Sequence, residues 1–214
     1  MKRFWFFDLD GTLADTDRDI REAWKAALAD LGLDCPDFDE KFVAGPPIDE
    51  MIGVLFPGRA TPELVAAVRE GFGRHYDRDG FPNTPEYPGV LDAVKRLKAA
   101  GAKVYIATNK RLAGATAMAE KFGWMKVFDG LYTGDMFKDD PKIGKMRKSD
   151  LLAWMLREFR VQPADCVMVG DTANDFTAAA ANGIESVGVT WGYGTADELA
   201  HASRIARTPE EIFG

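Results

Sequence analysis

The segment Phe4-Trp5-Phe6-Phe7-Asp8-Leu9-Asp10-Gly11-Thr12 joins a short run of large apolar residues to two aspartates and a glycine. The four apolar residues predict a strand that is buried on both faces, as in a parallel sheet. In open α/β sheets, ligands bind beyond the carboxyl ends of the strands, and Asp8 and Asp10 are expected to lie at such an end. The segment therefore predicts both an α/β fold and a functional site at the edge of its sheet.

Further apolar runs predict the rest of the sheet. They cover residues 104–107, 166–169 and 186–189, and a fifth candidate at 127–132 is interrupted by Asp129-Gly130. Helical patterns alternate with them, from Pro88 to Gly101, from Ser149 to Phe159 and from Phe176 to Ala181. This alternation predicts a Rossmann-like parallel sheet in a three-layer α/β/α core, with right-handed crossovers.

The stretch between Asp15 and Tyr87 carries helical patterns only, at residues 20–31, 48–55 and 63–76. Roughly 70 residues of helix after the first strand is far too long for an ordinary connection between a strand and a helix. We therefore expect an inserted helical domain at residues 15–84, and an α/β core domain formed by residues 1–14 and 85–214.

The spacing of Asp8 and Asp10 suits covalent catalysis. A carboxylate nucleophile forms a covalent intermediate and so divides one difficult displacement into two easier ones. A second carboxylate two residues later can return to the same site if the chain turns at Gly11. It could then protonate the leaving alkoxide and later deprotonate the attacking water.

Polar residues follow two other predicted strands. Thr108-Asn109-Lys110 offers a hydroxyl and an amide that can bind phosphate oxygens. The segment Gly170-Asp171-Thr172-Ala173-Asn174-Asp175 offers carboxylates. Mg²⁺ prefers a few carboxylate oxygens together with water and substrate phosphate, so Asp8, Asp171 and Asp175 would suffice to bind it.

With these motifs the chain resembles the haloacid-dehalogenase-like (HAD) hydrolases, and among them the phosphoglycolate-phosphatase-like phosphatases. The resemblance runs from Phe4 to the C-terminus and includes residues 188–194 after the last predicted strand. It implies that Asp8 is the nucleophile that becomes an aspartyl-phosphate and that Asp10 is the general acid and base. It further implies that Thr108 and Asn109 bind phosphate together with Gly11 and Thr12, and that Mg²⁺ binds to Asp8, Asp171, Asp175 and the backbone carbonyl of Asp10.

The family also has a lysine that binds the phosphate and restrains the nucleophile. Four lysines precede the predicted helix at Ser149, and they are Lys138, Lys142, Lys145 and Lys148. Lys148-Ser149-Asp150-Leu151-Leu152 resembles the variant in which the lysine begins the helix, which favours Lys148 over Lys145. The lysine-proline pattern that is common in the family is absent.

The helical insertion lies where the family carries a small cap that closes over the substrate. Gly45-Pro46-Pro47 is expected to form a loop that faces the site. Cations of the insertion could meet a carboxylate of the substrate, and the candidates are Arg18, Arg21, Lys41, Arg59, Arg74 and His75.

Composition restricts the partners. The formal net charge of -7 argues against general nucleic-acid binding, and no stretch approaches the roughly 20 apolar residues that a membrane span needs. The two cysteines, Cys35 and Cys166, are too few to form a disulfide framework. The N-terminal apolar run is interrupted by Asp8 and Asp10, too early for the apolar region of a secretory signal. We expect a cytoplasmic protein whose partner is a small phosphorylated metabolite, and the oligomeric state is left open.

The predicted function is a Mg²⁺-dependent phosphatase for a small monoester, such as a phosphoglycolate-like compound, a sugar phosphate or a nucleotide. A phosphosugar mutase uses the same pair of aspartates, although Thr12 after Asp10-Gly11 is typical of the hydrolases. A carbon–halogen dehalogenase would need neither Asp10 nor the acidic motif. A non-catalytic protein that binds phosphorylated metabolites is the alternative from another class.

Overall fold

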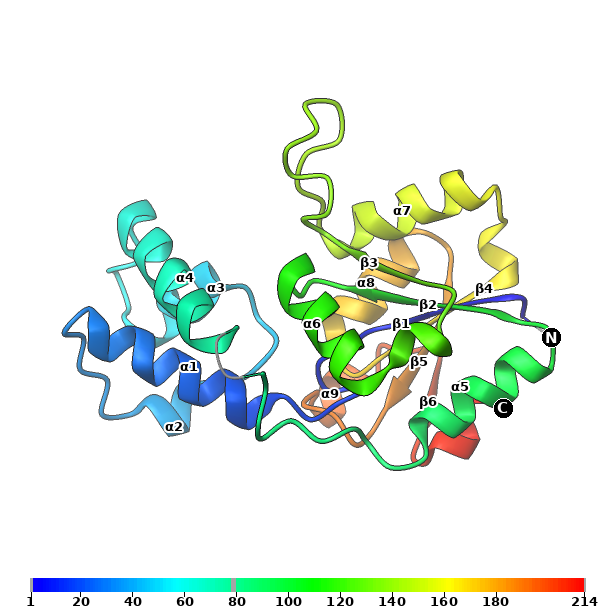
Figure 1. Cartoon of the computed structure of the whole chain (residues 1–214), viewed down its shortest axis with the longest axis horizontal. Helices are drawn as coiled ribbons and strands as arrows, with labels where there is room; N and C mark the ends of the chain where they lie inside the picture. Colours follow the sequence, from blue (N-terminus) through cyan, green and yellow to red (C-terminus); the bar gives the residue numbers. More distant parts are fainter. Residues whose placement is uncertain (1, 78–79, 214) are drawn as a thin grey trace. The chain divides into compact units, whose positions relative to one another are not determined.

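The computed structural model describes residues 2–77 and 80–213 (Figure 1). The chain divides into two compact units, Met1–Asp15 with Pro85–Gly214 and Thr16–Thr84, which we call the core unit and the helical unit. Each unit is described by itself. That the helical unit serves as a cap stays a prediction.

The core unit is built on one parallel sheet of six strands in the order β3-β2-β1-β4-β5-β6. Every neighbouring pair is parallel, and β1 lies between β2 and β4. The predicted α/β fold class is therefore confirmed. The strands are β1 (Phe4–Phe7), β2 (Lys103–Thr108), β3 (Gly130–Thr133), β4 (Cys166–Gly170), β5 (Glu185–Val189) and β6 (Arg204–Ala206).

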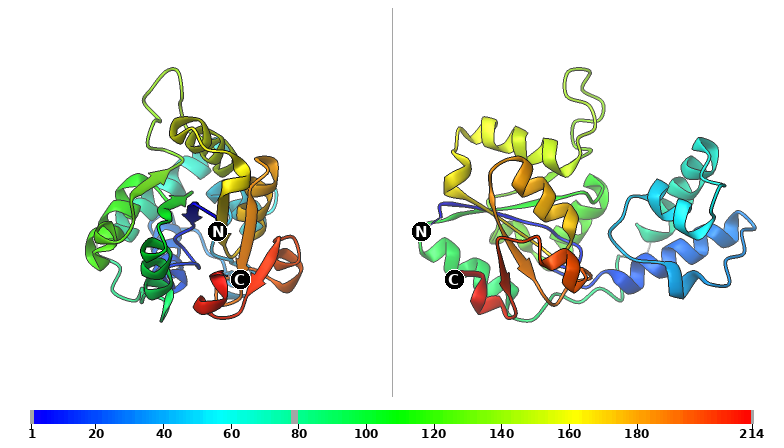
Figure 2. Two further views of the ribbon diagram at one scale, coloured as in Figure 1. Left: turned by 90° about the vertical axis from the view of Figure 1, so that its right-hand side faces the viewer. Right: turned by 180° about the vertical axis from the view of Figure 1, so that it is seen from behind.

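Helices cover both faces of this sheet (Figure 2). The chain moves from β1 through β2 to β3 in one direction, and then returns to β4 and β5 on the other side of β1. Because crossovers are right-handed, connections that run in opposite directions place their helices on opposite faces. The helices are α5 (Val90–Ala99), α6 (Leu112–Phe122), α7 (Lys148–Phe159), α8 (Ala173–Ala181) and α9 (Ala196–Leu199), with 3₁₀ turns at Trp124–Lys126, Pro163–Asp165 and Pro209–Phe213.

The packing of β1 explains its continuous apolar sequence. Phe6 is fully buried in a cluster with Leu152 and Met155 of α7 and with Met168 of β4. The side chain of Phe7 points to the other face, where its ring centroid lies 6.0 Å from that of Phe128. Since each side chain of this size contributes about 1.5–3 kcal/mol when it is buried, both faces of the strand stabilise the core.

The helical unit contains α1 (Asp17–Asp30), α2 (Phe38–Lys41), α3 (Ile48–Leu55) and α4 (Pro62–Tyr76). The helix α4 begins at Pro62, a residue that suits the first helical position. Thr61 caps the helix, because its hydroxyl accepts a hydrogen bond from Leu64 N. Gly71 of α4 faces Ala27 of α1, so a side chain at position 71 would crowd α1. These small residues allow α1 and α4 to approach each other closely.

Several predicted boundaries differ from the structure, and α1 begins at Asp17 rather than at residue 20. The strand expected at 127–132 begins only at Gly130, because Asp129 bends out of the ladder and accepts a hydrogen bond from Val104 N. The helix expected from Phe176 begins three residues earlier, at Ala173, because Thr172 and Asp175 form a capping box. The elements α2, α6, α9 and β6 were not predicted.

The carboxyl ends of β1 and β4 form the edge of the sheet at which a ligand site is expected. Connections leave these two adjacent strands in opposite directions, and ligands of open α/β sheets bind at such a point, beyond the carboxyl ends. Asp8 follows β1 there, and its backbone N–H donates to Val169 O of β4. Among the described residues, no helix has the length and apolar character to cross a membrane.

Candidate active site

Three buried carboxylates meet at this edge of the sheet. Asp8 follows β1, Asp171 follows β4, and Asp175 lies in the first turn of α8. Each offers a carboxylate oxygen, and the three oxygens lie within 4.8 Å of one another. The structure thus brings these three aspartates together, and their role as metal ligands stays a prediction.

Lys148 enters the same cluster from the first position of α7. Its Nζ atom lies 2.9 Å from Asp8 Oδ1 and forms a closer ion pair with Asp175 Oδ1. The side chain is almost fully buried. The structure therefore brings Lys148 against the expected nucleophile, whereas Lys138, Lys142 and Lys145 are exposed.

Burial and like charge shape the protonation of the cluster. Burial raises the pKa of Asp8 to about 6, with Asp175 and Asp10 adding to the effect and Lys148 opposing it. Burial, Asp175 and Asp8 likewise raise the pKa of Asp171 well above its usual value. Burial alone would lower the pKa of Lys148, but the charges of Asp175 and Asp8 outweigh it and raise that pKa. One lysine thus only partly compensates three carboxylates.

Asp171 is held by residues from two loops. Thr12 is fully buried and its hydroxyl donates to Asp171 Oδ1 over 3.2 Å, a partner that the sequence did not predict. The backbone N–H of Tyr193 donates to Oδ2 over 2.8 Å. Gly11 has φ +76°, and a Cβ atom at Gly11 or at Gly192 would overlap the Asp171 carboxylate. Glycine at these positions therefore leaves room for that carboxylate.

Asp175 is fixed by the end of its own helix. Its Oδ2 accepts hydrogen bonds from the backbone N–H and the hydroxyl of Thr172, at 3.2 and 3.1 Å. Its Oδ1 remains for Lys148. A side chain at Gly170, the last residue of β4, would overlap Asp175.

The carboxylate of Asp10 has a different partner. Lys110, two residues after β2, places its Nζ atom 2.8 Å from Asp10 Oδ1. The side chain of Lys110 is only 6% exposed, and that of Asp10 is 21% exposed. No role for Lys110 was predicted from the sequence, and the only signal that could have found it is its place directly after Thr108-Asn109.

The expected phosphate-binding residues differ in their surroundings. Thr108 is buried at the end of β2, and its hydroxyl accepts a hydrogen bond from Lys110 N at 3.2 Å. Asn109 is exposed.

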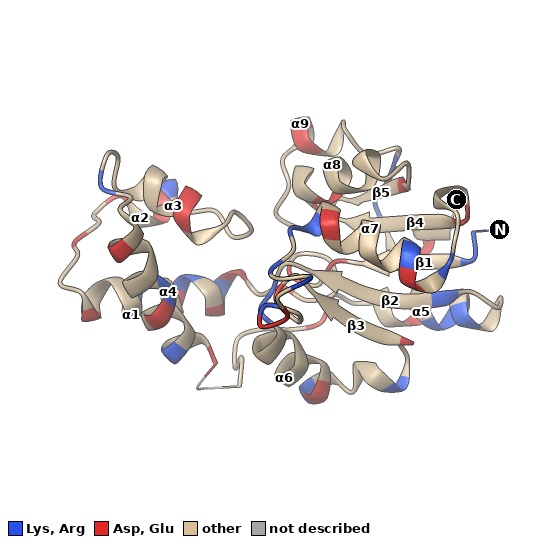
Figure 3. Ribbon diagram, turned by 90° about the horizontal axis from the view of Figure 1, so that it is seen from above, with Lys and Arg blue, Asp and Glu red and all other residues tan. Residues whose placement is uncertain are grey.

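The loop from β3 to α7 begins and ends at the site. Gly134 N donates a hydrogen bond to Thr108 O, and Met146 N donates one to Gly134 O. Figure 3 shows basic and acidic residues interspersed along this loop.

The donor set suits a hard divalent cation. All three carboxylates offer oxygen, which Mg²⁺ prefers. Asp8 Oδ1 is buried and, among the described residues, has the ion pair with Lys148 but no well-aligned hydrogen bond. The clustered negative charge and the raised pKa values of Asp8 and Asp171 both fit a bound cation.

Most of the candidate cations of the helical unit have carboxylate partners within that unit. These pairs are Arg18–Glu22, Arg21–Asp17, Lys41–Asp37, Arg74–Asp30 and His75–Asp30. Arg59 instead lies over the ring of Phe56, 5.5 Å from its centroid, and no ion pair of Arg59 occurs among the described residues.

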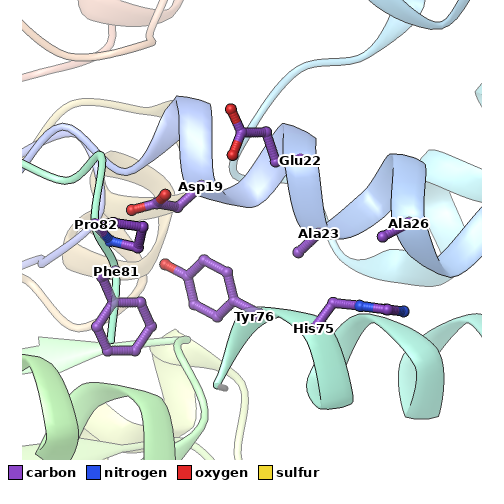
Figure 4. A pocket seen from close by; sticks show the side chains of 8 residues that line it. All are labelled: Asp19, Glu22, Ala23, Ala26, His75, Tyr76, Phe81 and Pro82. Carbon is purple, nitrogen blue, oxygen red and sulfur yellow. The ribbon is translucent and has the colours of Figure 1, made fainter. Parts of the chain in front are cut away.

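A cavity of about 210 Å³ lies within the helical unit, between α1 and α4 (Figure 4). Asp19 and Glu22 reach it from α1, and His75 and Tyr76 from α4. Both carboxylate oxygens of Asp19 already accept hydrogen bonds from Asn83, and Oδ2 also accepts one from Thr84. This carboxylate therefore joins the end of the unit to α1, and the cavity holds none of the expected catalytic groups.

Comparisons with known proteins identify the family of this chain. Residues 5–183 match the family model described as haloacid dehalogenase-like hydrolase. The probable phosphatase IndB of Dickeya dadantii is 33% identical over 100% of this chain and 93% of its own length. A tyrosine-protein kinase, PtkA of Mycobacterium tuberculosis, is also 33% identical over 94% of this chain and 67% of its own length.

Two further proteins extend the comparison. The phosphoglycolate phosphatase of Vibrio vulnificus is 30% identical over 91% of this chain and 86% of its own length. A crystal structure of a predicted phosphatase from Clostridium acetobutylicum superposes with a TM-score of 0.86, at 24% identity, over 99% of this chain and 96% of that one, which supports the fold. The predicted family and hydrolase class are confirmed, and the chain belongs to the haloacid dehalogenase-like hydrolases.

Proposed function

We propose that this protein is a Mg²⁺-dependent phosphatase that hydrolyses a small phosphate monoester through an aspartyl-phosphate on Asp8. The observation that carries the proposal is the position of Asp8, whose Oδ1 lies 2.9 Å from Lys148 Nζ inside the cluster of buried carboxylates. A nucleophile beside a cation, at the carboxyl end of a central strand, suits attack on an anionic phosphoryl group.

In the first step, a carboxylate oxygen of Asp8 forms a bond to phosphorus while the bond from phosphorus to the ester oxygen breaks. Asp10 gives a proton to that oxygen, so the leaving group departs as an alcohol. Lys148 places positive charge beside Asp8 and reduces the repulsion between this carboxylate and the incoming phosphoryl group. The hydroxyl of Thr108 and the amide of Asn109 are our candidates to donate hydrogen bonds to the phosphoryl oxygens.

In the second step, Asp10 takes a proton from water as the water oxygen attacks phosphorus. The bond from phosphorus to Asp8 breaks, inorganic phosphate leaves, and Asp8 returns to its carboxylate form. Asp10 thus acts first as an acid and then as a base. This is possible because Asp10 is a carboxylate once it has given up its proton, and the second step needs a carboxylate as the base.

Asp8, Asp171 and Asp175 would hold the cation, with the backbone carbonyl of Asp10 as the further ligand that the family implies. When bound, Mg²⁺ would supply positive charge to the phosphoryl oxygens and offset the repulsion between the carboxylates. Thr12, Tyr193 N and the capping box at Thr172 keep the side chains of Asp171 and Asp175 in place for this.

The relatives named phosphatases support a phosphate ester as substrate, but they differ in the ester that their names give. One is named phosphoglycolate phosphatase and another, 30% identical over 90% of this chain, is named 5'-nucleotidase. We therefore propose a small phosphorylated metabolite as the substrate class. The helical unit is our candidate for the part that reads the leaving group.

A second candidate comes from the relative named tyrosine-protein kinase. ATP could transfer its terminal phosphoryl group to Asp8 with release of ADP. The hydroxyl of a tyrosine could then replace water as the attacking group and give its proton to Asp10. The core residues named above would serve this reaction equally well. The two functions therefore differ in the group that accepts the phosphoryl group from Asp8, which is water in a phosphatase and a tyrosine in a kinase.

A phosphate-release screen tests the proposal. It would compare the purified protein and its Asp8→Asn variant on an aryl phosphate, 2-phosphoglycolate, sugar phosphates, nucleoside monophosphates and pyridoxal phosphate, with and without Mg²⁺. We expect Mg²⁺-dependent release that the variant lacks. Conversion of a sugar phosphate into an isomer without net release would favour a mutase, and transfer from ATP to a tyrosine peptide would favour the second candidate. Binding without any turnover would favour the non-catalytic alternative.

A further inference from the structure

We propose that Lys110 is the positioning residue for Asp10, and that it holds Oδ1 of the carboxylate so that Oδ2 is the oxygen left to face the reaction. This inference rests on the proposed function, in which Asp10 is the general acid and base. It assigns a role to a residue that follows a different strand, two residues after Thr108.

The geometry of the ion pair carries the argument. Lys110 Nζ lies 2.8 Å from Asp10 Oδ1, and the two side chains come from the ends of β2 and β1. No hydrogen bond to Asp10 Oδ2 occurs within residues 2–77 and 80–213. One oxygen of Asp10 is therefore engaged, and the other is left for exchange with the substrate or with water.

The burial of Lys110 sets this pair apart from a surface ion pair. An exposed ion pair contributes little, because solvent screens it and both side chains lose freedom. The side chain of Lys110 is only 6% exposed, and its backbone N–H is also bound, to the hydroxyl of Thr108 at 3.2 Å. A lysine that is enclosed and anchored in this way has a defined position from which to orient Asp10.

Electrostatics explains why Asp10 needs such a partner. Asp10 lies close enough to Asp8 for their negative charges to interact. Among the described residues, Lys110 is the cation that forms an ion pair with Asp10 and can offset this repulsion. Lys148 contacts the nucleophile and Lys110 contacts the acid and base, so two different lysines lie beside the two aspartates.

The test compares substrates that differ in their need for a proton. An alkyl phosphate that the wild-type protein hydrolyses requires protonation of its leaving oxygen, whereas p-nitrophenyl phosphate releases a weakly basic aryloxide. Rapid-quench kinetics would measure the rate at which Asp8 is phosphorylated from each. Because a general acid contributes about 10²–10⁴-fold, we expect Lys110→Met to slow this step at least about 10-fold for the alkyl phosphate. For the aryl phosphate we expect the rate of phosphorylation to fall by less than about 3-fold. The KM for each of the two substrates should change little.

Further variants make the result specific. Lys110→Arg keeps a cation and should recover part of the rate on the alkyl phosphate. In an Asp10→Asn background, Lys110→Met should add almost nothing, because residues that act as one unit are not additive. Lys95→Met, which changes an exposed lysine of α5 in the core unit, is the matched control and should behave as the wild type. Lys110→Gln replaces Lys110→Met if the latter fails to fold, as judged by circular dichroism.

The outcomes separate this inference from the proposed function. Equal losses on both substrates, no loss on either, or full additivity with Asp10→Asn would each overturn the role of Lys110 while the phosphatase proposal stands. A wild-type protein that phosphorylates Asp8 from neither ester would overturn the proposed function itself, and this inference with it.

Discussion

Lys148 Nζ and Asp8 Oδ1 lie 2.9 Å apart in the buried centre of the core unit. The lysine reaches this point because it is the first residue of α7, and the aspartate because it directly follows β1. The same lysine also pairs with Asp175. One side chain thus connects the expected nucleophile to the expected metal-binding motif.

Lys148→Met should therefore reduce turnover by about 10²-fold or more, since it removes the only cation found beside Asp8 in the described part of the chain. Lys145→Met should retain nearly all activity, because the side chain of Lys145 is exposed. Steady-state kinetics on an aryl phosphate would measure both. The reverse ranking of the two variants would move the phosphate-binding role to Lys145.

Asp10→Asn should slow hydrolysis of the aspartyl-phosphate more than it weakens Mg²⁺ binding. Its carboxylate pairs with Lys110 rather than joining the three clustered carboxylates, and its backbone carbonyl is unaffected by the substitution. Calorimetric titration with Mg²⁺ and the decay of the phosphorylated protein would be measured together. If Mg²⁺ affinity fell in step with turnover, Asp10 would have to be a ligand instead.

Mg²⁺ should raise the melting temperature, because a ligand that binds only the folded state stabilises it by mass action, by about 2.7 kcal/mol at 100 times Kd. Asp171→Asn should abolish most of this shift, since Asp171 belongs to the carboxylate cluster. The control Asp165→Asn changes an aspartate that pairs with Arg3 elsewhere in the core unit and should keep the shift. A full shift in Asp171→Asn would remove Asp171 from the metal site.

Gly192→Ala should impair both Mg²⁺ binding and turnover, because the added Cβ atom would overlap the Asp171 carboxylate. Gly53→Ala is the matched control, since its added Cβ atom meets nothing within 4 Å. Scanning calorimetry with and without Mg²⁺ would separate a local effect from a loss of fold. Wild-type Mg²⁺ affinity in Gly192→Ala would show that Asp171 can move without cost.

Replacement of the helical unit by a short linker tests its predicted role as a cap. A lid that excludes water and contacts the leaving group should matter most for the natural small substrate. We therefore expect a far larger loss of kcat/KM on that substrate than on a bulky aryl phosphate. Equal losses on both would mean that the unit only stabilises the core.

The sequence predicted the sheet and much of the site for a clear physical reason. Runs such as Phe4–Phe7 are apolar on both faces, which is characteristic of a central parallel strand, and polar residues after such runs mark the functional edge. Lys110 could not be assigned because its partner, Asp10, is distant in sequence and the pairing depends on the order of the strands. The hydrogen bond from Thr12 to Asp171 was missed for the same reason.

Elements that are short or have weak apolar patterns were also not predicted from the sequence. The strand β6 has three residues, with a partly exposed arginine at its start, and it lies at an edge of the sheet. The helix α6 is rich in alanine and has no strong apolar stripe, although Ala115 and Met118 are fully buried. Tertiary packing, rather than local sequence, determines both.

The central claim is that Asp8 carries the phosphoryl group, and direct detection of that group tests it. The wild-type protein would be mixed with Mg²⁺ and a phosphate ester that it hydrolyses, and the reaction would be quenched in acid within the first turnovers. The protein would then be digested and analysed by mass spectrometry. The account predicts that the peptide containing Asp8 gains the mass of one phosphoryl group, and that Asp8→Asn shows neither this gain nor phosphate release. Phosphate release by Asp8→Asn at more than about a tenth of the wild-type rate would contradict it, because covalent catalysis should supply several orders of magnitude.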